Sequence, residues 1–89
     1  MLSIRYTSAF KRDFKKAEKQ RKDAAKLRAV LELLVAGKAL PEKCRDHDLG
    51  GNWKGYRDCH IEPDWILLYR IEGKELILVR LGSHSDVFR

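Results

Sequence analysis

The chain has 89 residues, enough for one hydrophobic core and too few for two, so we expect a single domain over residues 1–89. Its hydrophobic fraction of 44% is typical of a globular protein, and no apolar run approaches the roughly 20 residues of a membrane-spanning helix. The net charge is +6, and residues 1–28 alone carry ten basic and three acidic side chains. This positive pole favours a polyanionic partner, although a solvated helix face that only keeps the protein soluble would carry the same charge.

The N-terminus and the cysteine content both favour a cytoplasmic protein. No signal-peptide core follows Met1. Cys44 and Cys59 are too few for a disulfide framework, so we expect two free thiols in a reducing compartment.

The first part of the chain predicts one strand followed by two helices. Apolar and polar residues alternate over residues 2–6, which is typical of a short strand. Ser8 is a good N-cap for a helix whose apolar residues recur with helical spacing over residues 10–17. Asp23 can cap a second helix, and Gly37 can end it. The basic pole therefore lies on an antiparallel helical hairpin.

The remainder predicts a long loop and three strands. Residues 38–54 form the loop, and long ordered loops are more often functional than not. The expected strands cover residues 56–61, 65–71 and 75–81, with tight turns between them, and the chain then loosens from Gly82. The order is β-α-α-β-β-β. We expect an α+β fold in which a small, mostly antiparallel sheet packs against the two-helix hairpin.

All three histidines lie in the second half of the chain. His47 falls in the long loop, His60 in the strand after it, and His84 near the C-terminus. A histidine gives or takes a proton near neutral pH because its unperturbed pKa is about 6.5. Together with Asp64 and Arg80, the histidines indicate acid–base chemistry on an anionic substrate.

Strand alternation predicts which of these side chains can meet. Tyr56, Asp58 and His60 share one face of their strand. His47 and Asp64 are close to His60 in sequence, so these three groups are expected to converge. In the last strand, Arg80 points to the same side as Leu76, Leu78 and Gly82, and so would His84 if the extended path continued. Bringing Arg80 and His84 to the same region depends on strand order, which the sequence leaves open.

A metal site is not expected. Cys44-x-x-His47 and Cys59-His60 contain residue types that bind zinc. Neighbouring residues of a strand point to opposite faces, however, so the second pair could not easily hold one ion. Taken singly, each histidine could also be a solvated or satisfied residue, and aromatic residues such as Trp65 are more often part of a core than a platform for bases.

Three stretches resemble bacterial type II toxins of the RelE superfamily, and most of all its YafQ branch. The first is KGYRDCHIEPDWILLY over residues 54–69. Upstream of it, Asp46-His47-x-Leu-x-Gly-x-Trp53 fits the same branch, as does the tail Arg80-x-Gly-x-His84-x-x-x-Phe88. The first 40 residues match only in pattern.

The resemblance implies an mRNA interferase that enters the ribosomal A site and cuts the translated mRNA without a metal or other cofactor. A ribose 2′-OH would attack the adjacent phosphate and usually leave a 2′,3′-cyclic phosphate. The implied partners are the ribosome, its mRNA and a DinJ-like antitoxin whose own N-terminal domain binds DNA. The toxin would be a monomer when free and would form a hetero-oligomer with the antitoxin.

The resemblance also implies which residues act. Catalytic residues of the branch stand at the positions of His47, His60, Asp64 and His84, and aromatic residues at Trp65 and Phe88 contribute to the site. We expect Asp64 or His60 to be the base and His84 the acid. His47 and Arg80 would stabilise charge on the phosphoryl oxygens, and Trp65 and Phe88 would stack or pack against a base.

The basic residues are expected to bind RNA. Lys54 and Arg57 are candidates for contacts to the substrate phosphates, and the helical hairpin would dock on ribosomal RNA through Lys11, Lys15, Lys19 and Lys22. Two other functions remain possible on the same scaffold. The ParE branch of the superfamily poisons DNA gyrase without nuclease activity, and a non-catalytic RNA-binding module would need the charge but not the histidines.

Overall fold

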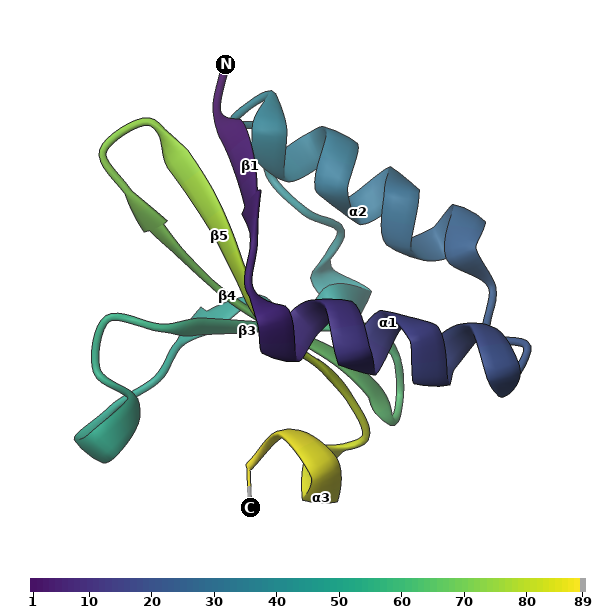
Figure 1. The fold of residues 1–89 in the computed structure, drawn as a ribbon. Coiled ribbons are helices and arrows are strands. Elements are labelled where there is room, and N and C mark those ends of the chain that lie inside the picture. Colours follow the sequence, from purple (N-terminus) through teal and green to yellow (C-terminus); the bar gives the residue numbers. More distant parts are fainter. Residues whose placement is uncertain (89) are drawn as a thin grey trace.

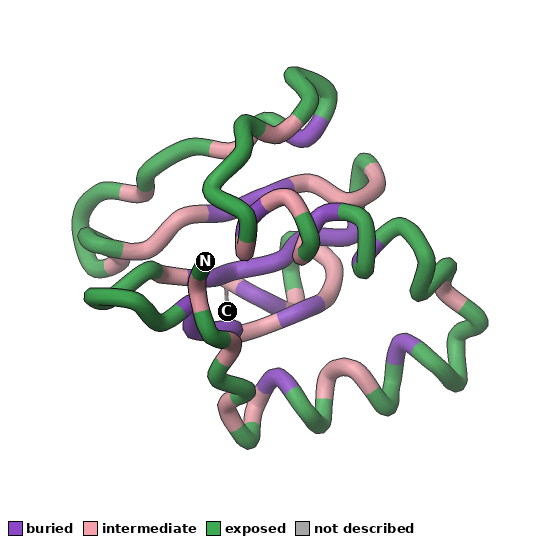
Figure 2. The backbone as a smooth tube through the Cα atoms, turned by 90° about the horizontal axis from the view of Figure 1, so that it is seen from above, coloured by how far each residue is buried: buried purple, intermediate pink, exposed green. Residues whose placement is uncertain are grey.

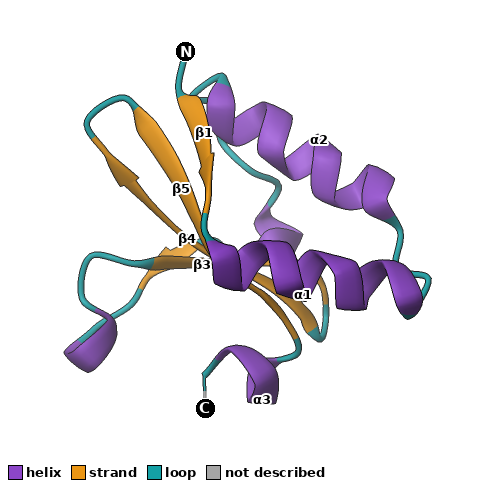
Figure 3. Ribbon diagram, viewed as in Figure 1, coloured by secondary structure: helices purple, strands orange, loops and turns teal. Residues whose placement is uncertain are grey.

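A computed structural model describes residues 1–88 as three α-helices, two short 3-10 helices and five strands (Figures 1 and 3). No helix in this range combines the length and the apolar composition needed to cross a bilayer. The elements in chain order are β1 (Ser3–Tyr6), α1 (Ser8–Lys19), α2 (Ala24–Val35), η1 (Glu42–Cys44), β2 (His47–Asp48), η2 (Gly51–Trp53), β3 (Arg57–Glu62), β4 (Trp65–Glu72), β5 (Glu75–Gly82) and α3 (His84–Val87).

The five strands form one sheet in the order β1-β5-β4-β3-β2. β1 runs parallel to β5, and the other three pairings are antiparallel. The predicted α+β fold with a mostly antiparallel sheet and two covering helices is therefore confirmed. The sheet has one strand more than expected, because β2 forms within the predicted loop.

Local capping defines both long helices. The N-cap of α1 is Thr7 and not the predicted Ser8, since the Thr7 hydroxyl accepts a hydrogen bond from Phe10 N at 3.1 Å. Asp23 caps α2 as predicted, through a hydrogen bond from Ala25 N at 3.0 Å. Gly37 ends α2 with a φ of 70°, in the left-handed region that glycine adopts without strain.

The main hydrophobic core lies between the helices and one face of the sheet. The buried residues run along the central strands and along the inner side of each helix, while the outer sides of the helices are exposed (Figure 2). The core is formed by Phe10, Ala17, Leu27, Val30, Leu34, Cys44, Cys59, Trp65, Leu67, Tyr69, Leu76, Leu78 and Leu81.

The helices α1 and α2 diverge from their short connection (Figure 1). A groove with a mainly apolar lining lies between them and reaches β1, with Ile4, Phe14 and Leu31 among its walls. The helical hairpin thus covers the sheet without closing over it.

A bulge in β5 changes the predicted alternation of side chains. Arg80 pairs with Leu68 and Leu78 pairs with Tyr69, so Val79 is an extra residue. Leu78 consequently faces the core under the helices, whereas Arg80 belongs to the row on the other face. The expectation that Arg80 shares its side with Leu76 and Leu78 was wrong, because the sequence alone does not reveal a bulge.

Both cysteines are free, as predicted, and both are buried. Cys59 has no exposed surface, and burial, followed by the neighbouring Cys44, raises the pKa of its thiol far above the ordinary value. We expect iodoacetamide to modify neither thiol in the native protein at pH 8 and both in urea, as counted by mass spectrometry. Rapid modification of Cys59 in the native protein would contradict this packing.

Candidate active site

His47 lies against a buried carboxylate. β2 places it opposite Asp58 of β3, and its Nδ1 is 2.9 Å from Asp58 Oδ1. The Asp58 side chain is only 3% exposed, whereas the imidazole is 53% exposed. The same Nδ1 lies 2.6 Å from the carbonyl oxygen of Arg45, a residue in the left-handed conformation with a φ of 48°.

These two neighbours determine which ring nitrogen of His47 is free. A carboxylate and a carbonyl both accept hydrogen bonds, so Nδ1 carries the proton and Nε2 is left for acid–base chemistry. The short contact aligns Nδ1 with the Arg45 carbonyl, and Asp58 Oδ1 has no hydrogen-bond partner of good geometry within residues 1–88. The buried Asp58 carboxylate thus lies behind the imidazole, on the side of Nδ1.

His84 is held at the start of α3. Its backbone N–H donates to Asp64 Oδ1 at 3.0 Å, and Ser83 caps the helix by accepting from Asp86 N at 3.2 Å. The extended path of β5 does not continue through His84, because the Ser83 cap starts a helix there. The turn before β4 and the C-terminal helix are therefore joined by Asp64 and His84, two predicted site residues whose proximity the sequence left open.

An aromatic cluster continues from His84. The ring centroids of His84 and Phe88 are 4.9 Å apart. The Phe88 ring packs edge to face on Trp53, with the centroids 5.6 Å apart, and Trp53 packs edge to face on Tyr56, with the centroids 5.7 Å apart. The sequence reasoning included Phe88 in the site and left Trp53 and Tyr56 out. Their spacing in the sequence was no guide to them, because only the folding of the η2 loop against α3 brings them to His84.

His60 and Asp64 line one cavity at the open edge of β3. The cavity extends toward α2, and the basic residues Lys26, Lys43 and Arg45 also line it. His60 and Asp64 thus line the same cavity, whereas His47 does not. Glu62 also lines it and pairs with Lys26 at 3.0 Å, so Lys43 and Arg45 provide the positive charge that suits an anionic ligand.

The sheet sets the distance between the two ends of the site. His60 pairs with Ile66, which pairs with Gly82, so His60 and Gly82 are two strand spacings apart, or about 10 Å. His47 lies one strand further along, next to Asp58. No hydrogen bond or ion pair within residues 1–88 joins His47, His60 and His84 to one another. They flank a region of the sheet and do not form a single hydrogen-bonded group.

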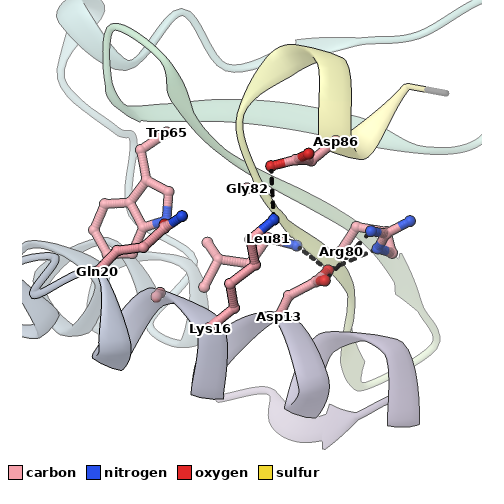
Figure 4. A pocket seen from close by; sticks show the side chains of 9 residues that line it. Asp13, Lys16, Gln20, Trp65, Arg80, Leu81, Gly82 and Asp86 are labelled. Atoms are coloured by element: carbon pink, nitrogen blue, oxygen red, sulfur yellow. Dashed lines mark hydrogen bonds and ion pairs between the residues drawn. The ribbon is translucent and has the colours of Figure 1, made fainter.

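Arg80 is paired with an aspartate of α1. Its Nε donates to Asp13 Oδ2 at 2.6 Å and its Nη2 to Asp13 Oδ1 at 3.3 Å, and Asp13 also accepts from Leu81 N at 2.9 Å (Figure 4). The hydrogen bond to Asp13 raises the pKa of the guanidinium. Beside this pair, Lys16 of α1 meets Asp86 of α3 at 3.5 Å (Figure 4). The charge of Arg80 is thus largely balanced by Asp13, and the pair fastens α1 to β5.

Trp65 lies in the core and not at an open surface. Only 2% of the residue is exposed, and Lys22 lies 5.9 Å above its ring. This burial argues against stacking of Trp65 on a base in this conformation, although the side chain also lines the pocket drawn in Figure 4. Lys22 also lies 3.7 Å from Glu62, so it is held on the protein surface beside Trp65.

The other basic residues divide into free and engaged side chains. Lys54 is exposed in the turn before β3, and Lys11, Lys15 and Lys19 are exposed on α1. Arg57 is half-buried and forms ion pairs with Asp46 and Asp48. Its predicted contact to a substrate phosphate is not supported by this geometry.

Within residues 1–88, no group of three or more His, Cys, Asp or Glu side chains is arranged to hold a metal ion. Cys59 is buried in the core, whereas the next residue, His60, lines the cavity near α2. The described residues thus present acid–base groups and positive charge.

The sequence matches the family of the bacterial toxin of type II toxin–antitoxin systems, YafQ, over residues 2–89. It is 44% identical over 86 residues to the mRNA interferase toxin YafQ of Escherichia coli, covering 96% of this chain and 94% of that protein.

Solved structures agree in fold over the whole chain. A copper-bound mutant toxin from Helicobacter pylori superposes with a TM-score of 0.96 and 41% identity, covering 99% of this chain and 100% of that one. YafQ in the E. coli DinJ–YafQ toxin–antitoxin complex superposes with a TM-score of 0.90 and 43% identity, covering 99% and 98%.

Proposed function

The chain belongs to the YafQ family of type II toxins, and on this premise we propose that it is an endoribonuclease that cleaves mRNA and thereby inhibits translation. The observation that carries the proposal is the pairing of His47 with the buried Asp58, 2.9 Å away. An exposed imidazole backed by a buried carboxylate is the arrangement of a general base and the group that orients it. A gyrase poison or a passive RNA-binding module has no need of such a pair.

Cleavage begins when the ribose 2′-OH loses a proton and attacks the adjacent phosphorus atom. Nε2 of His47 takes this proton, and Asp58 stabilises the resulting imidazolium. The bond to the 5′-oxygen breaks, and His84 donates a proton to that leaving group. The products are a 2′,3′-cyclic phosphate and a free 5′-OH. A matched base and acid each contribute about 10²–10⁴-fold to the rate.

Other residues bind the substrate around this chemistry. His60 and the basic lining of its cavity suit the negative charge that builds on the phosphoryl oxygens. Asp64 holds the backbone of His84 and so sets where the acid lies. Phe88, half-buried beside His84, is the aromatic residue placed to contact a base.

We place this reaction on the translating ribosome in the cytoplasm, where mRNA is cut as it is read. The exposed lysines of α1 supply the positive surface for ribosomal RNA. The YafQ protein of E. coli forms a complex with DinJ. By this relation we propose that an antitoxin of the same kind binds and neutralises this chain, which acts as a single domain and a monomer when released.

The proposal is tested by mapping mRNA 5′ ends in a translating extract and in the same extract depleted of ribosomes. The wild type is expected to produce new 5′ ends at in-frame positions only when ribosomes are present. The folded His84→Ala variant is expected to produce none, because the leaving group then has no acid.

Each other result contradicts a different part of the proposal. Cuts that persist without ribosomes would refute ribosome dependence alone, and equal cutting by His84→Ala would remove His84 from the chemistry. Intact mRNA with arrested translation would refute nuclease activity in favour of ribosome blocking. Intact mRNA with normal translation would point to the gyrase-poison function.

A further inference from the structure

The strand that carries His47 has little support from the sheet itself. β2 contains only His47 and Asp48, lies at an edge, and pairs with β3 at two positions. A two-residue edge strand is marginal without other contacts, because few hydrogen bonds offset the entropy lost on ordering it. Contacts other than the β2–β3 pairing must therefore hold His47, the proposed general base, in place.

Arg57 supplies that support from the neighbouring strand. Its Nε and Nη2 donate to the two carboxylate oxygens of Asp46, at 3.3 and 3.2 Å, and its Nη1 donates to Asp48 Oδ1 at 2.6 Å. Asp46 and Asp48 are the residues immediately before and after His47. One planar guanidinium thus binds the carboxylates of the residues on both sides of the histidine. The ammonium group of a lysine cannot reproduce this geometry.

Tyr69 connects the core to the group formed by Arg57, Asp46 and Asp48, which we call the clamp. Its hydroxyl donates to Asp46 Oδ1 at 2.5 Å, and the residue is 1% exposed. Burial and the Asp46 carboxylate raise the pKa of the Tyr69 phenol, so the group stays protonated and remains a donor. The hydrogen bond from Arg57 to Asp46 likewise raises the pKa of the guanidinium, which keeps its charge.

The clamp fixes the direction of His47 as well as its position. Side chains alternate along a strand, so Asp46 and Asp48 point to one face and His47 to the other. Arg57 pairs with Asp48 and shares its face, and Asp58 pairs with His47 and shares the other. Holding both aspartates on the Arg57 side therefore turns His47 toward Asp58.

We infer that Arg57 is a positioning residue for His47, acting through Asp46 and Asp48, and that it does not contact the RNA. This inference rests on the proposed nuclease function. Two carboxylates surround one guanidinium, so the group carries a net negative charge and does not attract a phosphate. Lys54, which is exposed and forms no ion pair within residues 1–88, provides the matched basic residue for comparison.

The first measurement reads the His47 ring by imidazole proton–nitrogen NMR in the intact protein. Arg57→Gln is expected to shift and broaden the His47 signals and to leave those of His84 unchanged, whereas Lys54→Gln changes neither. If Arg57→Gln does not fold, Asp48→Asn replaces it, since this exposed carboxylate is held only by the guanidinium. Unchanged His47 signals in the folded variant would overturn the inference.

The second measurement separates positioning from binding in single-turnover mRNA cleavage on ribosomes. Arg57→Gln is expected to lower the maximal rate about 10²-fold, with the half-saturating toxin concentration unchanged, because misplacing a catalytic group costs rate and not affinity. Lys54→Gln is expected to weaken binding and to reduce the salt slope of binding by about 1. A shallower salt slope with an unchanged rate in Arg57→Gln would show a direct phosphate contact instead.

A double-mutant cycle with Asp46→Asn completes the test. If Arg57 acts through Asp46, the double variant is expected to be no slower than Arg57→Gln alone, and losses that simply multiply would overturn the inference. Failure of the wild type to cleave mRNA would refute the proposed nuclease, while the His47 NMR signals would still decide whether Arg57 positions that ring.

Discussion

The His47→Gln variant is expected to cleave mRNA about 10²–10⁴-fold more slowly than the wild type in single-turnover assays. Glutamine is similar in length and can still donate a hydrogen bond to the Arg45 carbonyl, so the edge strand is preserved. What it lacks is a nitrogen that can take the proton of the 2′-OH. The loss should therefore appear in the maximal rate, with antitoxin binding and the urea midpoint of unfolding unchanged.

Asp58→Asn is the matched control for this prediction. It keeps the shape behind His47 and removes the negative charge that stabilises the imidazolium, so a smaller loss of rate is expected. Because both residues act as one unit, the double variant should be no slower than His47→Gln alone. Wild-type cleavage by His47→Gln would remove His47 as the base and return that role to His60 or Asp64.

The Trp65→Ala variant is expected to lose about 3–5 kcal/mol of stability, the cost of removing a large buried aromatic side chain. Trp65 is 2% exposed and lies among Ala17, Leu67 and Leu81 in the core. A domain of this size has a total stability of about 5–15 kcal/mol, so the variant should be close to unfolding at 37 °C. Urea denaturation followed by circular dichroism measures the loss as a lower midpoint with a similar slope.

Two comparisons separate the core role of Trp65 from a role in binding a base. Trp65→Phe should recover most of the stability and cleave mRNA at nearly the wild-type rate. Phe88→Ala should show the reverse pattern, with a small loss of stability and slower cleavage, because Phe88 is only half-buried and lies beside His84. A Trp65→Phe variant with full stability and greatly reduced cleavage would show that the ring contacts the substrate.

Local patterns were sufficient for most elements of the fold. The helix from Asp23 to Gly37 was predicted at both ends, because a capping carboxylate and a glycine with positive φ act within a few residues. The strands β3, β4 and β5 were found by their apolar content and the turns between them. β2 escaped prediction because a two-residue strand has no periodicity to detect.

The candidate site was predicted less completely than the fold. The sequence left open whether His84 lies near Asp64, and the structure joins them by a hydrogen bond from His84 N to Asp64 Oδ1. His47 was expected only to stabilise charge, because nothing in the sequence reveals that the carboxylate behind it is buried. Arg57 was expected to bind RNA, and its two aspartate partners become visible only when β2 and β3 pair.

The sequence by itself determined the two long helices, the four longer strands, the turns and the residue types of the site, because caps, alternation and turn chemistry act over short distances. Only the tertiary structure decided the parallel pairing of β1 with β5, the bulge at Val79 and the burial of Trp65. Those features arise from contacts between residues far apart in the chain, such as Thr7 with Leu78 and Asp13 with Arg80. Their energies depend on how all the layers pack at once, so no local pattern encodes them.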